Sequence, residues 1–217
     1  MIVAAHQPNF LPWAGYFYKY LMCDTWVDLV GVQIERRGYV TRTGFGNEAR
    51  TLTVPSRGSS RDAIHDTQVL PGDRKYRKLV ATLEHGVAHA PYRHRADSVL
   101  DYLHSISNPM PVSKFNLDLI GLMIEEADIP RKEFRAIDTT SKKATETTHE
   151  WLHRVIKSAG GTGYLSGEGA KEYLPEDFPM PVWYQKTYRQ VYTGSYLWVM
   201  VYHHDPLGYL FDNFQIE

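Results

Sequence analysis

Cysteine is almost absent from this chain, and its single representative, Cys23, excludes any disulfide within the protein. No stretch approaches the roughly 20 consecutive apolar residues that a membrane-spanning helix needs. Residues 1–6 have neither the basic segment nor the long apolar segment of a secretion signal. From these three absences we predict a cytoplasmic protein without membrane insertion.

The chain also lacks an excess of charge of either sign. The chain has 24 basic and 25 acidic residues, and its formal net charge is −1. A chain of this kind has no overall field that draws it to nucleic acid or to an anionic membrane, although a local basic groove is compatible with it. The sequence therefore weakens, without excluding, an interaction with DNA.

Two catalytic motifs are missing. There is no Gly-x-Ser-x-Gly segment, which disfavours a serine hydrolase. His85 and His89 have the spacing of zinc ligands on a helix, but Gly86 stands where the zinc-protease motif requires glutamate. His203 and His204 are adjacent, and adjacent residues of a strand point to opposite faces. We predict no metal site.

The hydrophobic periodicity predicts an α/β protein. Residues 2–5 and 26–30 form apolar runs typical of buried strands, and a helical spacing of apolar residues begins between them at Trp13. Residues 134–137, 151–156 and 164–167 repeat the strand, helix and strand order. Such units build a mostly parallel central sheet, Rossmann-like or nucleotidyltransferase-like. We expect a single α/β domain over residues 1–217, with residues 75–128 forming a helical insertion or subdomain within it.

The loop after the first strand is the strongest candidate for chemistry. It contains His6, Gln7 and Asn9, and Pro8 and Pro12 stiffen it. Open α/β sheets bind ligands at the carboxyl ends of their strands, and the amino end of the following helix attracts anions such as phosphate or carboxylate. The alternative is that these polar groups only satisfy the buried backbone of the loop. Both interpretations stay open at this point.

Two further segments have a functional and a structural interpretation. The turn at residues 166–169 contains two glycines, which let backbone amides approach a ligand, but it is equally consistent with an ordinary turn. Residues 183–202 are rich in tyrosine and tryptophan. They either close a ligand pocket or form a dimer contact, and aromatic packing in the core is the simpler alternative.

Several motifs together resemble the WbqC-like proteins. The most specific is the run at residues 6–17, HQPNFLPWAGYF, and the resemblance spans most of the chain. The chain departs from the family pattern at residues 30–32, where an acidic pair is usual, and at residues 195–198, which lack an aspartate. The other matching positions are Lys19, Cys23, Asp24, Val32, Gln33, residues 52–55, Asn116, Lys142 or Lys143, residues 164–167, Tyr173 and Leu174.

The resemblance implies an enzyme, a transferase that attaches glycine or a similar small activated group to a sugar- or nucleotide-type acceptor. WbqC-like proteins occur among surface-polysaccharide genes, which is the basis of this expectation. One alternative is a bacteriophage-type amino-acid transferase that acts on a hypermodified base in DNA. Another is a non-catalytic protein that binds a nucleotide or a glycan.

The expected site follows from the motif residues. The donor should carry a phosphate or carboxylate group, and the acceptor should be a sugar, a nucleotide or modified DNA. We expect no cofactor, with Mg²⁺ needed only if the donor is a nucleotide or pyrophosphate, and we leave a homodimer open. The predicted catalytic residues are His6, Gln7, Asn9 and Lys19. The predicted substrate-binding residues are Pro8, Trp13, Tyr16, Asp24, Gln33, Arg42, Asn116, Lys142, Ser166, Gly167 and Tyr173.

Overall fold

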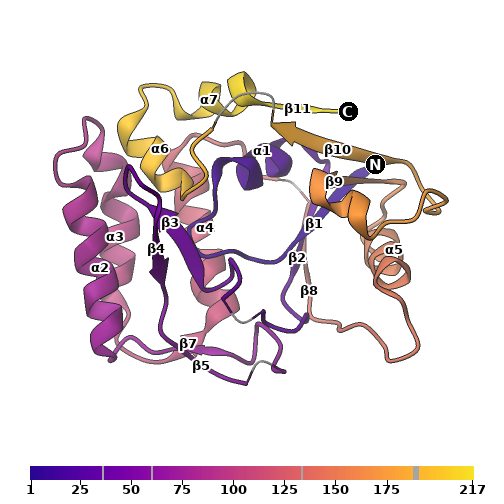
Figure 1. Cartoon of the computed structure of the whole chain (residues 1–217), viewed down its shortest axis with the longest axis horizontal. Helices are drawn as coiled ribbons and strands as arrows, with labels where there is room; N and C mark the ends of the chain where they lie inside the picture. Colours follow the sequence, from indigo (N-terminus) through magenta and orange to yellow (C-terminus); the bar gives the residue numbers. More distant parts are fainter. Residues whose placement is uncertain (36, 60, 133, 188–190) are drawn as a thin grey trace.

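A six-stranded sheet forms the centre of the computed structural model, which describes residues 1–35, 37–59, 61–132, 134–187 and 191–217 (Figure 1). Five of the strands run parallel, and the last one is antiparallel to its neighbour. In spatial order the strands are β8 (Phe134–Asp138), β2 (Thr25–Leu29), β1 (Ile2–His6), β9 (Gly163–Gly167), β10 (Val182–Thr187) and β11 (Phe214–Ile216).

The strand order confirms the Rossmann-like α/β expectation. Counted along the chain, the six strands lie in the order 3-2-1-4-5-6, which is the order of Rossmann folds. β1 is central: Val3 pairs with Thr25 of β2 on one side and with Tyr164 of β9 on the other. The chain therefore adds β2 and β8 on one side of β1 and then crosses to the other side of β1, where it adds β9, β10 and β11. In such sheets ligands bind beyond the carboxyl ends of the strands.

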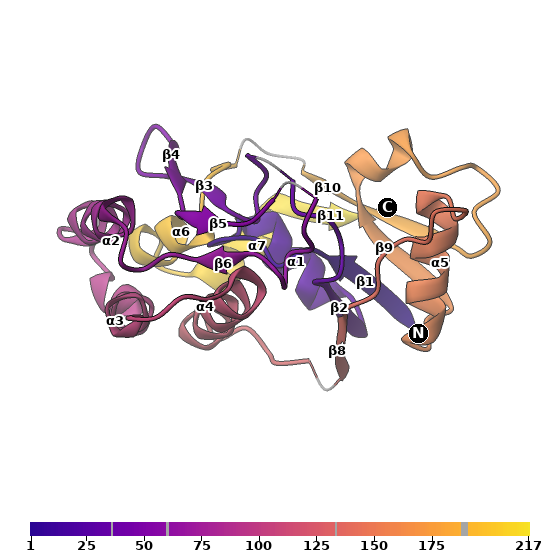
Figure 2. The same cartoon turned by 90° about the horizontal axis from the view of Figure 1, so that it is seen from below.

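Helices cover both faces of this sheet, and Figure 2 shows α1 (Ala14–Met22) and α5 (Thr148–Ser158) on opposite sides. Successive side chains of a strand point to opposite faces. Accordingly Ala4 packs into the core that includes α1, whereas Val3 and Ala5 pack into the core that includes α5. The two faces of β1 are both buried, as expected for a central parallel strand.

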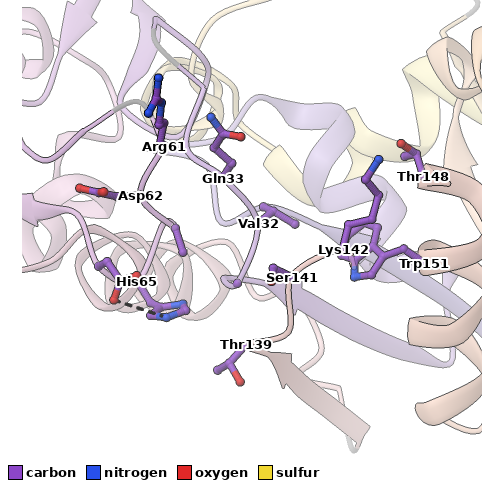
Figure 3. A pocket seen from close by; sticks show the side chains of 13 residues that line it. Val32, Gln33, Arg61, Asp62, His65, Thr139, Ser141, Lys142, Thr148 and Trp151 are labelled. Carbon is purple, nitrogen blue, oxygen red and sulfur yellow. Dashed lines mark ion pairs between the residues drawn. The ribbon is translucent and has the colours of Figure 1, made fainter. Parts of the chain in front are cut away.

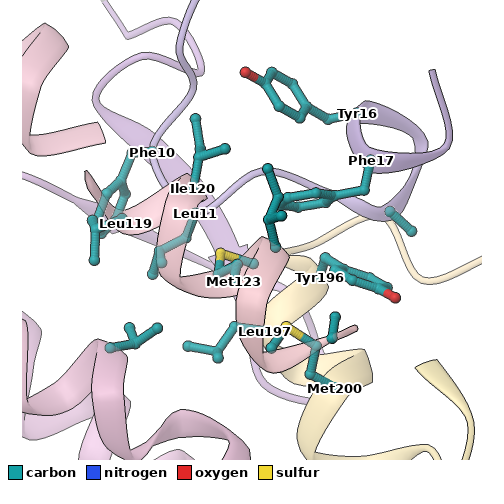
Figure 4. Close-up of a cluster of buried hydrophobic side chains, with 14 of the residues drawn as sticks. Phe10, Leu11, Tyr16, Phe17, Leu119, Ile120, Met123, Tyr196, Leu197 and Met200 are labelled. Carbon is teal, nitrogen blue, oxygen red and sulfur yellow. The ribbon is translucent and has the colours of Figure 1, made fainter. Parts of the chain in front are cut away.

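Three helices occupy the middle of the chain: α2 (Arg74–Val87), α3 (Asp97–Ser105) and α4 (Val112–Glu126). The buried residues of each helix recur at helical spacing, as Leu79, Leu83 and Val87 do on α2. The side chain of Phe115 on α4 stacks with Phe10, at 6.0 Å between ring centroids, so α4 packs directly against the loop after β1. Figure 4 shows Phe10 of this loop in the same buried cluster as Leu119 and Met123 of α4. The assignment of residues 75–128 as an insertion or subdomain remains a prediction.

Smaller elements complete the fold around the carboxyl ends of the parallel strands. β3 (Arg42–Phe45) pairs with β4 (Arg50–Thr53), and β5 (Ser56–Arg57), β6 (Gln68–Val69) and β7 (Met110–Pro111) form a small antiparallel sheet. Two short 3₁₀ helices span Arg93–Ala96 and Glu168–Glu172. Within the described ranges, no helix combines the length and apolar character needed to cross a bilayer.

The aromatic C-terminal segment contributes to the core. Helices α6 (Tyr196–Tyr202) and α7 (Pro206–Asn213) follow β10. Tyr196 is fully buried and packs on Phe17 of α1, with ring centroids 5.0 Å apart (Figure 4). Residues 188–190 of this segment lie outside the described residues. The simpler interpretation, core packing, thus holds for Tyr196, and a dimer contact stays untested.

Candidate active site at the carboxyl ends of the first strands

Polar side chains line one face of the sheet beneath α1, in an otherwise apolar core. His6 at the end of β1 lies beside Asp28 of β2 in the strand register, and Trp26 lies beside Arg135 of β8. Because residues in register on parallel strands face the same side, His6, Asp28 and Arg135 share the face that α1 covers. We call these three residues, together with Trp26 of β2 and Lys19 of α1, the polar row.

Asp28 is the centre of the polar row. Its side chain is completely buried and accepts hydrogen bonds from Trp26 Nε1 at 2.9 Å and from Arg135 Nε at 2.6 Å. Burial acts against the charge of Arg135, but the hydrogen bond and the negative charge of Asp28 outweigh it and raise the pKa of the guanidinium. A buried carboxylate is tolerated only when it is paired in this way.

His6 is held as a neutral ring. Its Nδ1 lies 2.8 Å from the carbonyl oxygen of Gln7, and a carbonyl only accepts, so Nδ1 carries the proton and Nε2 is left as an acceptor. The ring lies between Trp26, stacked at 6.2 Å, and Tyr16, edge-on at 5.1 Å. Burial, and then the nearby charge of Lys19, lower the pKa of His6 to about 3. His6 can therefore accept a hydrogen bond from a ligand at neutral pH without being charged.

Lys19 places a second cation in the row. Its side chain is buried, and its ammonium group lies 5.7 Å from the centre of the Trp26 ring. Burial lowers the pKa of this amine to about 8. Tyr16 responds in the opposite direction: burial and the charge of Asp28 raise the pKa of its hydroxyl, which stays protonated. The row thus combines a neutral acceptor at His6 with a positive charge at Lys19.

A cavity of about 620 Å³ reaches the polar row at Asp28 and Arg135, and we call it the α4 cavity. Helix α4 supplies Lys114 and Asp118, whose charged groups are 2.8 Å apart. The cavity lies within the size range of small-molecule sites, and paired charges of both signs line it. The remaining lining residues are Val30, His65, Ser113, Leu117, Ile137 and Thr139.

A second, larger cavity of about 770 Å³ adjoins the first, since His65 and Thr139 line both. We call it the α5 cavity, because Thr148 and Trp151 of α5 form part of its wall. The structure brings two of the predicted binding residues, Gln33 and Lys142, to this cavity although they are more than one hundred positions apart in the sequence.

A third cluster lies at the end of β9. Ser166 donates a hydrogen bond to the Tyr164 hydroxyl at 3.2 Å, and the Tyr173 hydroxyl interacts with both. Burial raises the pKa of Tyr173 despite these hydrogen bonds. Three of the predicted residues, Ser166, Gly167 and Tyr173, are therefore neighbours at the strand next to β1.

Asn116 connects α4 to the loop after β1. It is fully buried, and its Nδ2 donates hydrogen bonds of 2.8 Å to the carbonyl oxygens of both Pro8 and Val40. The same loop contains Leu11 with a φ of 41°, a conformation rare for a branched residue. Asn9 is also buried. We assign Asn116 a positioning role, because it holds the loop that carries His6 and Gln7.

The other predicted residues lie apart from the polar row. Asp24 precedes β2 and accepts a hydrogen bond from the backbone of Ile2 at 2.7 Å, so it lies at the amino ends of the strands, opposite the site. Trp13 packs edge-on against Phe214, with 5.5 Å between ring centroids. Arg42 lines a separate cavity of about 470 Å³. None of these three reaches either of the adjoining cavities.

Replacement of Asn116 by alanine tests the positioning role. We expect a loss of about 2–4 kcal/mol of unfolding free energy, because two buried carbonyl groups lose their donor and a small void remains. Urea denaturation of Asn116→Ala measures it. Asn108→Ala is the matched control, since Asn108 is exposed, and it should change stability by less than about 0.5 kcal/mol. Equal effects of the two substitutions would contradict the assignment.

Sequence reasoning missed Asp28 and Arg135. The signal was present, because a charged residue at position 28 interrupts the apolar run of β2. Burial of an unpaired carboxylate costs so much that such a residue calls for a partner. The sequence nevertheless does not name the partner, which stands 107 positions later.

The comparisons with known proteins add one finding. The family model described as WbqC-like protein family matches residues 7–193, which is most of the chain and includes every residue of the polar row except His6. No curated protein and no solved structure matches the chain. Among the residues that the structure describes, no three His, Cys, Asp or Glu side chains are grouped as metal ligands.

Proposed function

This chain belongs to the WbqC-like protein family, and from the site described above we propose that it is a transferase acting at the carboxyl ends of β1, β2 and β8. The observation that carries the proposal is the pair of adjoining cavities that share His65 and Thr139. Group transfer needs two ligands held side by side, and each of these cavities has the volume of a small-molecule site.

The polar row gives the residues distinct roles in this proposal. Nε2 of His6 accepts a hydrogen bond from the attacking group of the acceptor. The lowered pKa of His6 favours this anchoring role over that of a general base, whose pKa should lie near the working pH. Lys19 stabilises negative charge that develops during transfer. Gln7 and Asn9 orient the ligand from the same loop.

The proposed substrates follow from the family and from the charges of the site. The α4 cavity presents Arg135 and Lys114 beside Asp28 and Asp118, so it can bind the carboxylate and the ammonium group of an amino acid. We propose a glycine-like donor group and a sugar- or nucleotide-type acceptor. Two alternatives must be distinguished from this proposal by experiment: transfer to a base in DNA, and binding of the ligands without catalysis.

A thermal-shift screen tests the proposal on the purified chain. The panel contains free amino acids, nucleotides, nucleotide-sugars and modified DNA, each with and without Mg²⁺. A ligand present at about 100 times its dissociation constant adds roughly 2.7 kcal/mol of stability. For a chain of this size that raises the Tm by about 5–10 °C. We expect such shifts with an amino acid and with a sugar or a nucleotide.

An assay of transfer on the ligands found in this screen tests the role of His6. Mass spectrometry of mixtures that give a shift should reveal a transferred group, and His6→Ala should lower its rate at least about 100-fold. His94→Ala is the control, because His94 is exposed and lines neither cavity. A shift only with modified DNA would replace the proposed acceptor, and ligand binding without any transferred group would replace catalysis by binding.

A further inference from the structure

The α5 cavity has two walls of different character (Figure 3). Arg61, Asp62 and His65 lie on one side, and Lys142, Thr148 and Trp151 lie on the other. The second wall combines the end of the loop after β8 with the first turn of α5. It consists of groups that donate hydrogen bonds: an ammonium, a hydroxyl and an indole N–H.

Trp151 provides the most informative of these groups. The residue is only 6% exposed, and Nε1 has no hydrogen-bond partner among the residues that the structure describes. An indole nitrogen can only donate, so it needs an acceptor. A buried donor without an acceptor costs about 1–3 kcal/mol. Because Trp151 borders the cavity, an acceptor atom of a bound ligand would remove this cost.

The neighbouring donors are available to the same ligand. Lys142 is exposed and forms no ion pair with any described residue. Thr148 is the first residue of α5, an eleven-residue helix whose amino end carries partial positive charge. The capping box of Thr147 and Glu150 satisfies part of that end. The backbone N–H groups of Thr148 and His149 lie nearest to its start, and within the described part of the chain neither donates a hydrogen bond to another residue.

The acidic groups of the cavity belong to the opposite wall. Asp62 accepts a hydrogen bond of 2.6 Å from the backbone of Ser59, and Asp66 lies 3.6 Å from His65. Both carboxylates are therefore engaged by neighbours, and Arg61 adds a positive charge beside them. On the α5 side the described lining residues include no carboxylate, so a ligand with anionic oxygens meets only donors and the Lys142 charge there.

We propose that the α5 cavity binds the anionic oxygens of a carboxylate or phosphate group, with Trp151 Nε1, the Lys142 ammonium and the Thr148 hydroxyl as donors. This inference rests on the proposed function, because the anion belongs to one of the two substrates of transfer. It adds Thr148 and Trp151 to the site and gives the α5 cavity the anionic substrate.

Calorimetric titration tests the proposal without turnover. The probes are pyrophosphate for the phosphate arm and acetate for the carboxylate arm. We expect saturable binding of one arm and a Kd at least 10-fold higher in Lys142→Gln and in Trp151→Phe. Lys143→Gln is the matched control: Lys143 is the exposed neighbour that does not line the cavity, and its variant should bind as the parent chain does.

The outcomes separate this inference from the proposed function. Lys142→Gln changes an exposed side chain, so its folding should be normal, whereas Trp151→Phe removes the buried donor and keeps an aromatic ring. Binding that weakens in these two variants and persists in His6→Asn supports the anion site whatever the reaction is. No saturable binding of any probe, or equal weakening by Lys142→Gln and Lys143→Gln, would overturn it. Loss of transfer in His6→Asn alone concerns the proposed function.

Discussion

Asp28→Ala is expected to lower the unfolding free energy by about 3–5 kcal/mol and to abolish transfer. Asp28 is completely buried and holds both Trp26 and Arg135 through hydrogen bonds. Its removal leaves the guanidinium and the indole N–H without an acceptor, and breaking one partner out of a buried ion pair costs this much. The substitution also removes the side chain that lies beside His6 in the register of β1 and β2.

Urea denaturation and an assay of transfer measure the two effects of Asp28→Ala separately. Asp24→Ala is the control from the start of the same strand, and it should cost no more than about 1 kcal/mol because Asp24 is exposed. The double substitution Asp28→Leu with Arg135→Met removes both charges and should recover most of the stability. If transfer returned with stability, Asp28 would have only a structural role.

Acid should destabilise the protein through His6. The pKa of its ring is about 3 in the folded chain and near 6.5 when unfolded, so between these values the unfolded chain binds the additional proton. Stability is therefore complete above pH 6.5 and falls as the pH is lowered toward 3, by up to about 1.4 kcal/mol for each pH unit. Between pH 6.5 and 4.5 the contribution of His6 amounts to about 2–3 kcal/mol.

Denaturation at several pH values between 4.5 and 7.5 measures this dependence. Other groups titrate over the same range, so the informative quantity is the difference between the parent chain and His6→Asn. Asparagine can still donate to the carbonyl of Gln7 but does not titrate. Its pH dependence should be shallower by the amount expected for His6. Parallel curves for the two proteins would show that His6 is not held neutral by the fold.

Much of the local structure was accessible to prediction. The largely apolar runs at residues 2–5, 26–30 and 164–167 correspond to β1, β2 and β9, because a central parallel strand is buried on both faces and is therefore rich in apolar residues. The helix predicted at residues 151–156 likewise corresponds to α5. The loop after β1 was correctly expected at the carboxyl end of the first strand, where its stiffness follows from Pro8 and Pro12.

The partners within the site were not accessible in the same way. A strand's periodicity states which side chains share a face, but it does not state which strand lies beside it or in which register. The alignment of His6 with Asp28 and the pairing of Asp28 with Arg135 both depend on those long-range choices. For the same reason Asp24 was predicted at the site although the register places it at the opposite ends of the strands.

By itself, the amino-acid sequence determined the strand, helix and strand order at residues 2–30 and 134–167, the family motif and the position of the first loop, since each depends on residues close together in the chain. Only the tertiary structure decided that β1 lies between β2 and β9 and that His65 and Thr139 line two cavities. It also decided that Trp151 borders one of them with an indole nitrogen that has no partner among the described residues. These features arise from contacts between distant segments, whose free energies depend on how the whole chain packs.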